Sequence, residues 1–353
     1  MHHLFRALLN LQALVVLTGL ASATPLSLGA AESSSPLQSP AACRSVQGAP
    51  GPEDLTWDAA ASGYYISSDD RRAAAAGKAT RGEVYFFQPR EEGGTDQLKP
   101  LTAGAPTDFH PHGISLYTAP DGRRWLFVIN HRENGGNTLE RFAVQDGVLA
   151  HLETIAYPSL TSPNDVVAVG ERMLYASNDT GTQKGLPFVI EVLTARPWAS
   201  LSYWDGSEGR LIQKRLRYAN GVTTSRDGKR LYLSEVSGRT VSIFDRDLQT
   251  GALTLKRRIQ VPGGPDNIEL DPQGRLWVAL HPDSFAFVKH AKDAKNPSPF
   301  RIVRIDAETG ALERVMEDDG KRISAVSTAS VGKHSWLMGG VFESTLLVCP
   351  PLP

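Results

Sequence analysis

Oxygen-bearing side chains recur at matching places along this chain. They are the pairs Glu53-Asp54, Asn164-Asp165 and Asp266-Asn267, together with Asn220. Carboxylate and amide oxygens are the ligands that Ca²⁺ prefers, at about six to eight per ion, and the sequence offers no Cys and His cluster at zinc spacing. Each pair taken singly has an ordinary alternative as a turn or cap former. Their repetition favours a calcium site.

Two histidines lie beside strand-like segments, His112 ahead of one and His131 after another. A lone histidine beside a strand is ordinarily a structural residue, so these two do not by themselves indicate catalysis. A serine nucleophile is not indicated, because no Gly-x-Ser-x-Gly sequence occurs.

Short strands in a repeating pattern must position these side chains. The clearest strand-like runs are 64–67, 84–87, 125–129, 231–234, 240–244 and 276–280. The polar residues that open each repeat are Glu53, His112, Asn164, Asn220, Asp266 and Ser324. They recur at intervals of roughly 46 to 59 residues, which is typical of four-stranded propeller blades with insertions. The pattern predicts an all-β fold, a six-bladed β-propeller whose inner strands start at one end of a central channel.

Composition agrees with this fold and excludes some partners. The chain has 32 Gly and 23 Pro among 353 residues, which favours many turns over long helices. Its 37 basic and 38 acidic residues give a formal net charge of -1. We therefore expect no nucleic acid partner and no binding to an anionic membrane.

The first residues have the pattern of an export signal. Arg6 precedes an apolar run over 7–20, and the small residues 21–23 form a cleavage site. The alternative, an uncleaved membrane anchor, needs a longer and less interrupted run. We predict a signal peptide over 1–23, a flexible lead-in over 24–42, and a propeller domain over 43–353. No transmembrane segment is expected after cleavage, and the protein should be secreted or periplasmic.

The chain has only two cysteines, Cys43 and Cys349, one near each end of the mature protein. An exported protein meets an oxidising compartment, so a disulfide is expected, and it would close the propeller by joining its two chain ends. The loop-entropy model gives such a bridge roughly 4 to 5 kcal/mol. Two unrelated buried thiols are the alternative.

Seven segments resemble motifs of the paraoxonase/arylesterase family, in the same order. They are 51–55, 109–115, 128–131, 163–170, 218–221, 265–268 and 276–282, and the resemblance runs from Cys43 to Cys349. It implies two calcium ions in the channel. Glu53, Asn164, Asn220, Asp266 and Asn267 would hold the catalytic ion. Asp54, Asp165 and the backbone carbonyl of Ile114 would hold a deeper structural ion.

The resemblance also implies roles for other residues. His112 and His131 match the family's proposed histidine dyad, and Glu53 and Asp266 are the alternative bases. His281 would contact substrate. The loop 68–82, which carries Arg71, corresponds to the family's mobile lid but differs in composition.

The implied function is calcium-dependent hydrolysis of lactones and aryl esters by metal-activated water, with phosphotriesters as a further candidate class. The partner would be a small-molecule ester or lactone. A gluconolactonase-type sugar lactonase is one alternative, because its single metal site would need neither the histidine dyad nor the second carboxylate set. A non-catalytic, calcium-stabilised binding propeller is another.

Overall fold

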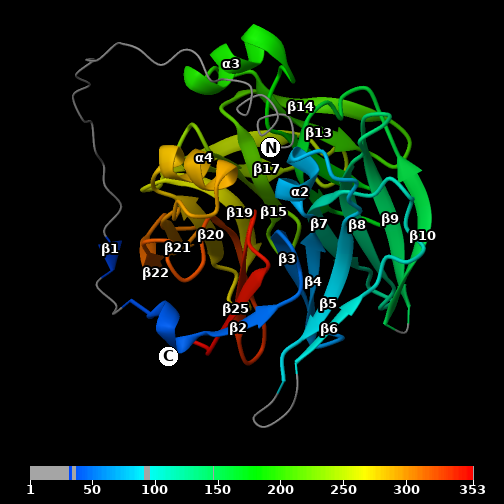
Figure 1. The fold of residues 1–353 in the computed structure, drawn as a ribbon. Helices are drawn as coiled ribbons and strands as arrows, with labels where there is room; N and C mark the ends of the chain where they lie inside the picture. The colour runs from blue at the N-terminus through cyan, green and yellow to red at the C-terminus, as the bar shows by residue number, and fades with distance from the viewer. Residues whose placement is uncertain (1–31, 34–36, 91–95, 146, 353) are drawn as a thin grey trace.

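The computed structural model describes residues 32–33, 37–90, 96–145 and 147–352 as six sheets arranged around a central axis, five of them four-stranded and one five-stranded (Figure 1). The first blade contains β3 (Pro52–Asp58), β4 (Gly63–Ser68), β5 (Glu83–Gln88) and β6 (Gln97–Pro100). The second contains β7 (Pro111–Thr118), β8 (Arg124–His131), β9 (Asn137–Gln145) and β10 (Val148–Ile155). The third contains β11 (Pro163–Ala168), β12 (Leu174–Asn178), β13 (Ala199–Trp204) and β14 (Gly209–Leu216).

The remaining blades follow in chain order. The fourth contains β15 (Ala219–Thr224), β16 (Arg230–Glu235), β17 (Thr240–Arg246) and β18 (Leu253–Gln260). The fifth contains β19 (Gly264–Leu270), β20 (Leu276–His281), β21 (Phe300–Ile305) and β22 (Leu312–Asp318), with β1 (Glu32–Ser33) paired in parallel to β22. The sixth contains β23 (Val326–Val331), β24 (Trp336–Gly340) and β25 (Thr345–Cys349). The prediction of a six-bladed β-propeller is confirmed.

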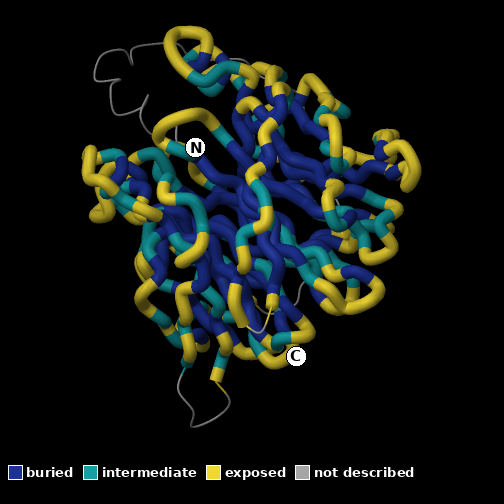
Figure 2. The backbone as a smooth tube through the Cα atoms, turned by 90° about the vertical axis from the view of Figure 1, so that its right-hand side faces the viewer, coloured by how far each residue is buried: buried dark blue, intermediate teal, exposed yellow. Residues whose placement is uncertain are grey.

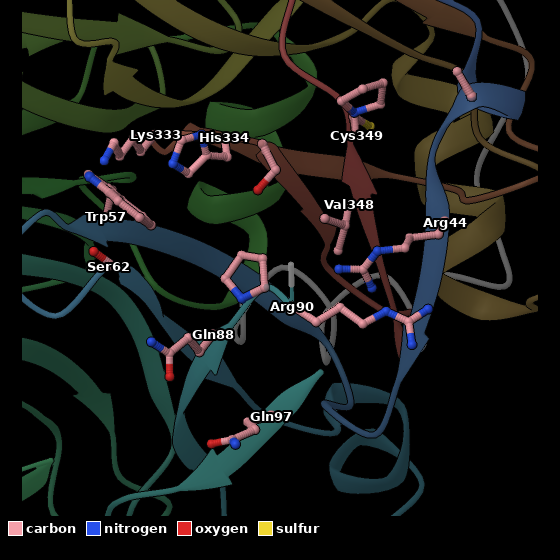
Figure 3. Close-up of a pocket in the computed structure, with 14 residues that line it drawn as sticks. Arg44, Trp57, Ser62, Gln88, Arg90, Gln97, Lys333, His334, Val348 and Cys349 are labelled. Atoms are coloured by element: carbon pink, nitrogen blue, oxygen red, sulfur yellow. The ribbon is translucent and has the colours of Figure 1, made fainter. Parts of the chain in front are cut away.

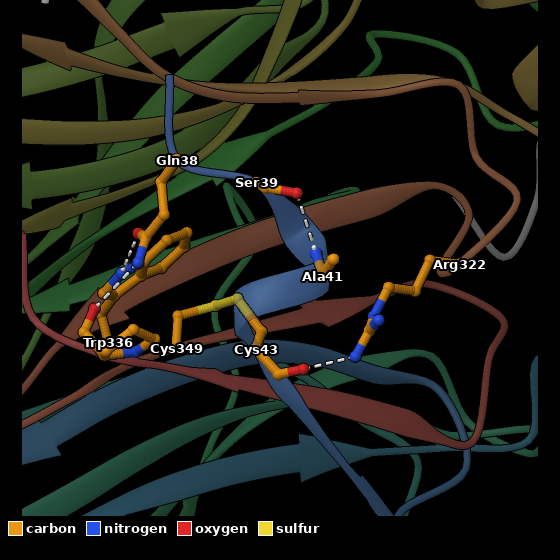
Figure 4. Close-up of a disulfide and its surroundings, with 8 residues drawn as sticks. Gln38, Ser39, Ala41, Cys43, Arg322, Trp336 and Cys349 are labelled. Atoms are coloured by element: carbon orange, nitrogen blue, oxygen red, sulfur yellow. Dashed lines mark hydrogen bonds between the residues drawn. A yellow bond between two sulfur atoms is a disulfide. The ribbon is translucent and has the colours of Figure 1, made fainter. Parts of the chain in front are cut away.

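The two ends of the chain meet in the sixth blade. Strand β2 (Arg44–Gln47) comes from the N-terminal side and pairs antiparallel with β25 as the blade's outer strand. A disulfide joins Cys43 to Cys349, as predicted, with 4.2 Å between their Cα atoms (Figure 4). Next to it, the short 3₁₀ helix η1 (Pro40–Ala42) and Gln38 pack on the blade, and Gln38 accepts a 3.0 Å hydrogen bond from the indole of Trp336.

Six apolar clusters hold the blades together, one between each pair of neighbours. Between the second and third blades, for example, Phe127 and Ile129 pack with Leu174 and Ala176. Figure 2 shows the result, since buried backbone forms the interior and exposed residues gather in the turns. Strands with both faces covered explain why the sequence shows apolar runs in place of strict alternation.

The innermost strand of every blade has an irregular register at the position of the recurring polar residues. In β3 the shift falls between Pro52 and Asp54, and the equivalent shift in β23 falls between Val326 and Thr328. Ser327 therefore occupies in the sixth blade the position of Glu53 in the first. The sixth repeat opens three residues later than the sequence pattern predicted from Ser324.

Three helices lie at one end of the propeller (Figure 1). They are α2 (Arg71–Ala75), α3 (Gly185–Leu193) and α4 (Ser284–Lys292), which connect the second and third strands of the first, third and fifth blades. Because each inner strand also begins at this end, the helices stand over the recurring polar residues. In the described part of the chain, no helix combines the length and apolar character needed to cross a bilayer. The predicted signal peptide, 1–23, lies outside the described residues, and the boundary after residue 42 stays a prediction.

Candidate metal and catalytic site

The five residues predicted to hold a catalytic ion all begin inner strands, and each is at most 2% exposed. Each keeps a buried side-chain oxygen that has no hydrogen-bond partner among the described residues. These atoms are Glu53 Oε2, Asn164 Oδ1, Asn220 Oδ1, Asp266 Oδ1 and Asn267 Oδ1. A buried polar atom without a partner costs about 1 to 3 kcal/mol, so a set of five indicates a ligand.

Asn267 and Glu53 connect the fifth blade to the first. The Asn267 amide donates to Glu53 Oε1 and to the Glu53 backbone carbonyl, each at 3.1 Å. Burial raises the pKa of Glu53 to about 8, with the negative charges of Asp266 and Asp54 adding to the shift and the positive charge of Arg71 opposing it. The positive charge of Arg71 does not offset burial and the neighbouring carboxylates, and a divalent cation would supply the further positive charge.

Asp54 and Asp165, predicted to hold a deeper ion, each bridge two neighbouring blades. Asp54 Oδ2 accepts from the backbone N–H of Ile114 at 2.8 Å, and Asp165 Oδ2 accepts from Val222 at 2.6 Å. Burial raises the pKa of Asp54 to about 7, and burial together with the charge of Asp54 raises the pKa of Asp165. Asp54 therefore lies against the Ile114 backbone and close enough to Asp165 for their charges to interact, while the ligand role of the Ile114 carbonyl stays a prediction.

The donor set fits a hard cation. No group of three or more His, Cys, Asp and Glu in the described residues is arranged to hold a metal ion. The candidate set depends instead on three asparagine amides and one backbone carbonyl alongside its carboxylates. Such all-oxygen sets suit Ca²⁺ and disfavour softer metals.

The two predicted histidines lie against each other. The rings of His112 and His131 meet edge to face, with centroids 4.8 Å apart and an interplanar angle of 76°. His112 Nε2 lies 3.6 Å from Glu53 Oε2, and His131 Nδ1 lies 2.8 Å from Asn137 Oδ1. The dyad is therefore adjacent to the candidate ion through Glu53.

His281, which was predicted to contact substrate, lies against Asp266. Its Nε2 lies 2.7 Å from Asp266 Oδ2, and its ring packs on Phe287 of α4 at 4.5 Å between centroids. The imidazole can therefore orient the Asp266 carboxylate, whose other oxygen is one of the five without a partner. Carboxylate ligands are often fixed in this way by a second hydrogen-bonding group.

Comparison with known proteins agrees with this geometry. The sequence model of the family described as Arylesterase matches residues 74–350. The chain belongs to the arylesterase family. It is 31% identical to serum paraoxonase/arylesterase 1 of Homo sapiens over 246 residues, covering 68% of each chain. It is 31% identical to serum paraoxonase/arylesterase 2 of Gallus gallus over 243 residues, covering 67% of this chain and 68% of the relative.

Two solved structures share the fold of this arylesterase-family chain. A gluconolactonase from Xanthomonas campestris superposes with a TM-score of 0.53 at 18% identity, covering 88% of this chain and 90% of that one. A luciferin-regenerating enzyme superposes with a TM-score of 0.53 at 17% identity, covering 87% and 95%. At these identities the likeness shows the propeller alone. Family membership itself confirms the prediction of an enzyme of the esterase and lactonase class.

Sequence reasoning gave no role to one residue of the site, Arg71. It begins α2, where Asp70 caps the helix by accepting from Ala73, and its side chain is only 6% exposed. The guanidinium reaches down to His112, with 3.0 Å between Arg71 Nη2 and His112 Nδ1. In the sequence, the one feature that could have drawn attention to this residue is the Arg71-Arg72 pair in the predicted lid.

Two cavities are lined by none of the five residues that were predicted to hold the catalytic ion. One, of about 800 Å³, opens between the first and sixth blades and is lined by residues such as Trp57 and Lys333 (Figure 3). The other, of about 590 Å³, includes Ile114, Asp165 and Glu269 in its lining. Because this second cavity includes none of the five catalytic-ion residues, it approaches the deeper set from the other end of the channel.

Proposed function

We propose that this chain hydrolyses lactones and aryl esters in a calcium-dependent reaction. The observation that carries the proposal is the set of five buried side-chain oxygens without partners, because they belong to the five residues predicted to hold the catalytic ion. Asp54, Asp165 and the Ile114 carbonyl would hold a second, structural ion. Relatives named paraoxonase, arylesterase and lactonase support the substrate classes.

When bound at these oxygens, Ca²⁺ supplies a positive charge that polarises the substrate carbonyl and stabilises the oxyanion formed on it. Asn267 orients Glu53 and His281 orients Asp266, so the carboxylates are fixed before substrate arrives. The proton of the attacking water passes to a base drawn from the histidine dyad, Glu53 or Asp266. No covalent acyl-enzyme is needed. Phosphotriesters offer a similar polarised oxygen and are a candidate side activity.

The decisive test is hydrolysis of an aryl acetate and an aliphatic lactone before and after treatment with a chelator. Both activities should fall at least about 100-fold and return when Ca²⁺ is restored, because the oxyanion loses its main stabilising charge. Circular dichroism of the chelated protein shows whether the loss reflects unfolding. Full activity in the chelated protein would sink the proposal, whereas calcium-dependent hydrolysis of sugar lactones alone would indicate the gluconolactonase-type alternative.

We also propose export to an oxidising compartment, secreted or periplasmic, with 1–23 as the signal peptide. The Cys43–Cys349 disulfide supports it, because such bonds persist mainly outside the reducing cytosol. The relatives are named as serum enzymes, and this agrees with export. N-terminal sequencing of the mature protein should begin near Thr24.

A further inference from the structure

Arg71 places a positive charge inside the molecule, beneath α2. Its guanidinium donates to the carbonyl oxygens of Gly51 at 3.1 Å and of Val341 and Pro111 at 3.4 Å, and so connects the first, second and sixth blades. Gly51 makes room for it: φ there is +57°, and a Cβ would lie 3.0 Å from Arg71 Nη1 and 2.8 Å from the Val341 carbonyl. A buried charge persists only where it is hydrogen-bonded. The guanidinium also donates to the Asp69 carbonyl at 3.4 Å, and its one side-chain partner among these contacts is His112 Nδ1, 3.0 Å from Nη2.

This contact determines which nitrogen of His112 carries the proton. A guanidinium stays protonated and has donors only, so the ring nitrogen that faces it must present a lone pair. With its lone pair on Nδ1, His112 carries its proton on Nε2, the nitrogen that lies 3.6 Å from Glu53 Oε2. If Nδ1 also carried a proton, its N–H would face an N–H of the Arg71 guanidinium, and the two donors would repel each other. His112 thereby presents an N–H, not a lone pair, on the side that faces Glu53.

The neighbouring ring has the opposite tautomer. The Asn137 amide donates to the Thr161 carbonyl at 3.1 Å, which fixes its Nδ2 and turns Oδ1 toward His131. An amide oxygen only accepts, so His131 Nδ1, at 2.8 Å, carries the proton. In the neutral ring the lone pair is then on Nε2. The two rings, in edge-to-face contact, hold their protons on different nitrogens.

We propose that Arg71 is a positioning residue, which fixes His112 as the proton-donating ring of the pair and leaves His131 as the ring that accepts a proton. In the hydrolysis, an O–H bond of water breaks and its proton goes to His131 Nε2, while the water oxygen bonds to the carbonyl carbon. The carbon–oxygen bond to the leaving group then breaks, and the leaving oxygen takes the proton back. The proton transfer to His131 rests on the proposed function. The assignment of the two tautomers does not depend on it.

The tautomers can be read directly from ¹⁵N-histidine spectra of the folded protein, recorded without substrate and assigned with His112→Gln and His131→Gln. In the wild type, His112 should show an unprotonated Nδ1 and a protonated Nε2, and His131 the reverse. Arg71→Met removes the donor and keeps the apolar stem, so the His112 signals should shift toward an average of both tautomers. Arg71→Lys, which still donates one hydrogen bond, should restore part of the wild-type signal.

Arg72→Met is the matched control, because Arg72 belongs to the same helix but donates to the carbonyls of Phe342 and His290. It should leave the His112 signals unchanged. A protonated Nδ1 on wild-type His112, or an unchanged tautomer in Arg71→Met, overturns the proposal.

Kinetics test the catalytic half. Arg71→Met should lower kcat about 10-fold or more with little change in KM, and His131→Gln should lower kcat by about 10²- to 10⁴-fold. Wild-type kcat in His131→Gln overturns the accepting role of that ring. If the wild type shows the expected tautomers but no calcium-dependent hydrolysis, the proposed function fails while the role of Arg71 in fixing His112 stands.

Discussion

At the scale of single residues, two carboxylates stand ready to balance the charge of each candidate ion. Glu53 and Asp266 belong to the catalytic set and Asp54 and Asp165 to the deeper set, so each set balances one divalent charge. Asparagine amides and a backbone carbonyl supply further oxygens without adding charge. With its charge thus balanced, a bound ion still presents a strong local field to a substrate oxygen, since the interior screens it weakly.

Replacing Asn220 or Asp266 by Ala should abolish turnover while leaving the fold largely intact. Each removes one of the five oxygens, and we expect kcat to fall at least about 10²-fold. Steady-state kinetics at saturating Ca²⁺, with thermal unfolding followed by circular dichroism, measure both effects. Asn134→Ala, at an exposed asparagine in the β8–β9 turn, is the control. Wild-type rates in either site variant would remove the proposed catalytic site.

At the scale of elements, the irregular register of the inner strands gathers the ligands. A bulge lets consecutive residues of one strand face a common centre, which regular alternation would prevent. Gly113 and Gly221 allow neighbouring inner strands to approach closely. A Cβ at Gly113 would lie 2.5 Å from the Asp165 Cα, and one at Gly221 would lie 2.7 Å from the Asn267 Cα. A side chain at either glycine would push the ligand-bearing strands apart.

Helix α2 is held over the site by a second cluster. Arg72 donates to the Phe342 carbonyl and lies 5.0 Å from the centroid of the Phe342 ring, and it also contacts His290 of α4. His290 Nε2 lies 2.8 Å from Glu343 Oε1. This cluster joins α2 and α4 to the turn between β24 and β25, whereas the Arg71 side chain is held separately by the carbonyls of Gly51, Val341 and Pro111.

The stability that Glu343 contributes should depend on pH. The hydrogen bond to His290 lowers the pKa of Glu343 below its ordinary value of 4.5, against the opposing effect of burial and with help from the charges of His290 and Arg72. A depressed pKa means that the contribution is present above pH 4.5 and lost as pH falls through the folded-state value. Glu343→Gln should therefore lower the unfolding temperature at pH 6 to 7, and the difference from wild type should shrink toward pH 3.

Thermal unfolding of both proteins across this pH range measures the effect. Glu308→Gln is the control, because the Glu308 side chain is 67% exposed on another blade. Its difference from wild type should be small at every pH. A Glu343→Gln difference that grows as pH falls would contradict the assignment.

For the whole molecule, the repeat of polar residues was enough to predict six blades and to place Glu53, Asn164 and Asn220 at equivalent positions of inner strands, because a propeller repeats one unit around an axis. The sixth repeat was misplaced because Ser327 carries neither a carboxylate nor an amide. The role of Arg71 was out of reach, since it depends on where a five-residue helix docks and on the left-handed backbone of Gly51. Contacts between side chains far apart in sequence have no local pattern.

Closure of the ring gives the last prediction. Strand β2 is held in the sixth blade by its pairing with β25 and by the Cys43–Cys349 disulfide, which spans 306 residues (Figure 4). Cys349 ends β25, which runs in the same direction as the inner strand β23 and so away from the end that carries α2, α3 and α4. Removal of the bridge should therefore affect stability and spare the site. Replacing both cysteines by Ser should cost about 5 kcal/mol and lower Tm by about 5 to 10 °C. A reducing agent should lower the wild-type Tm toward that of the variant and leave the variant unchanged; equal Tm values would show that β-pairing alone closes the propeller.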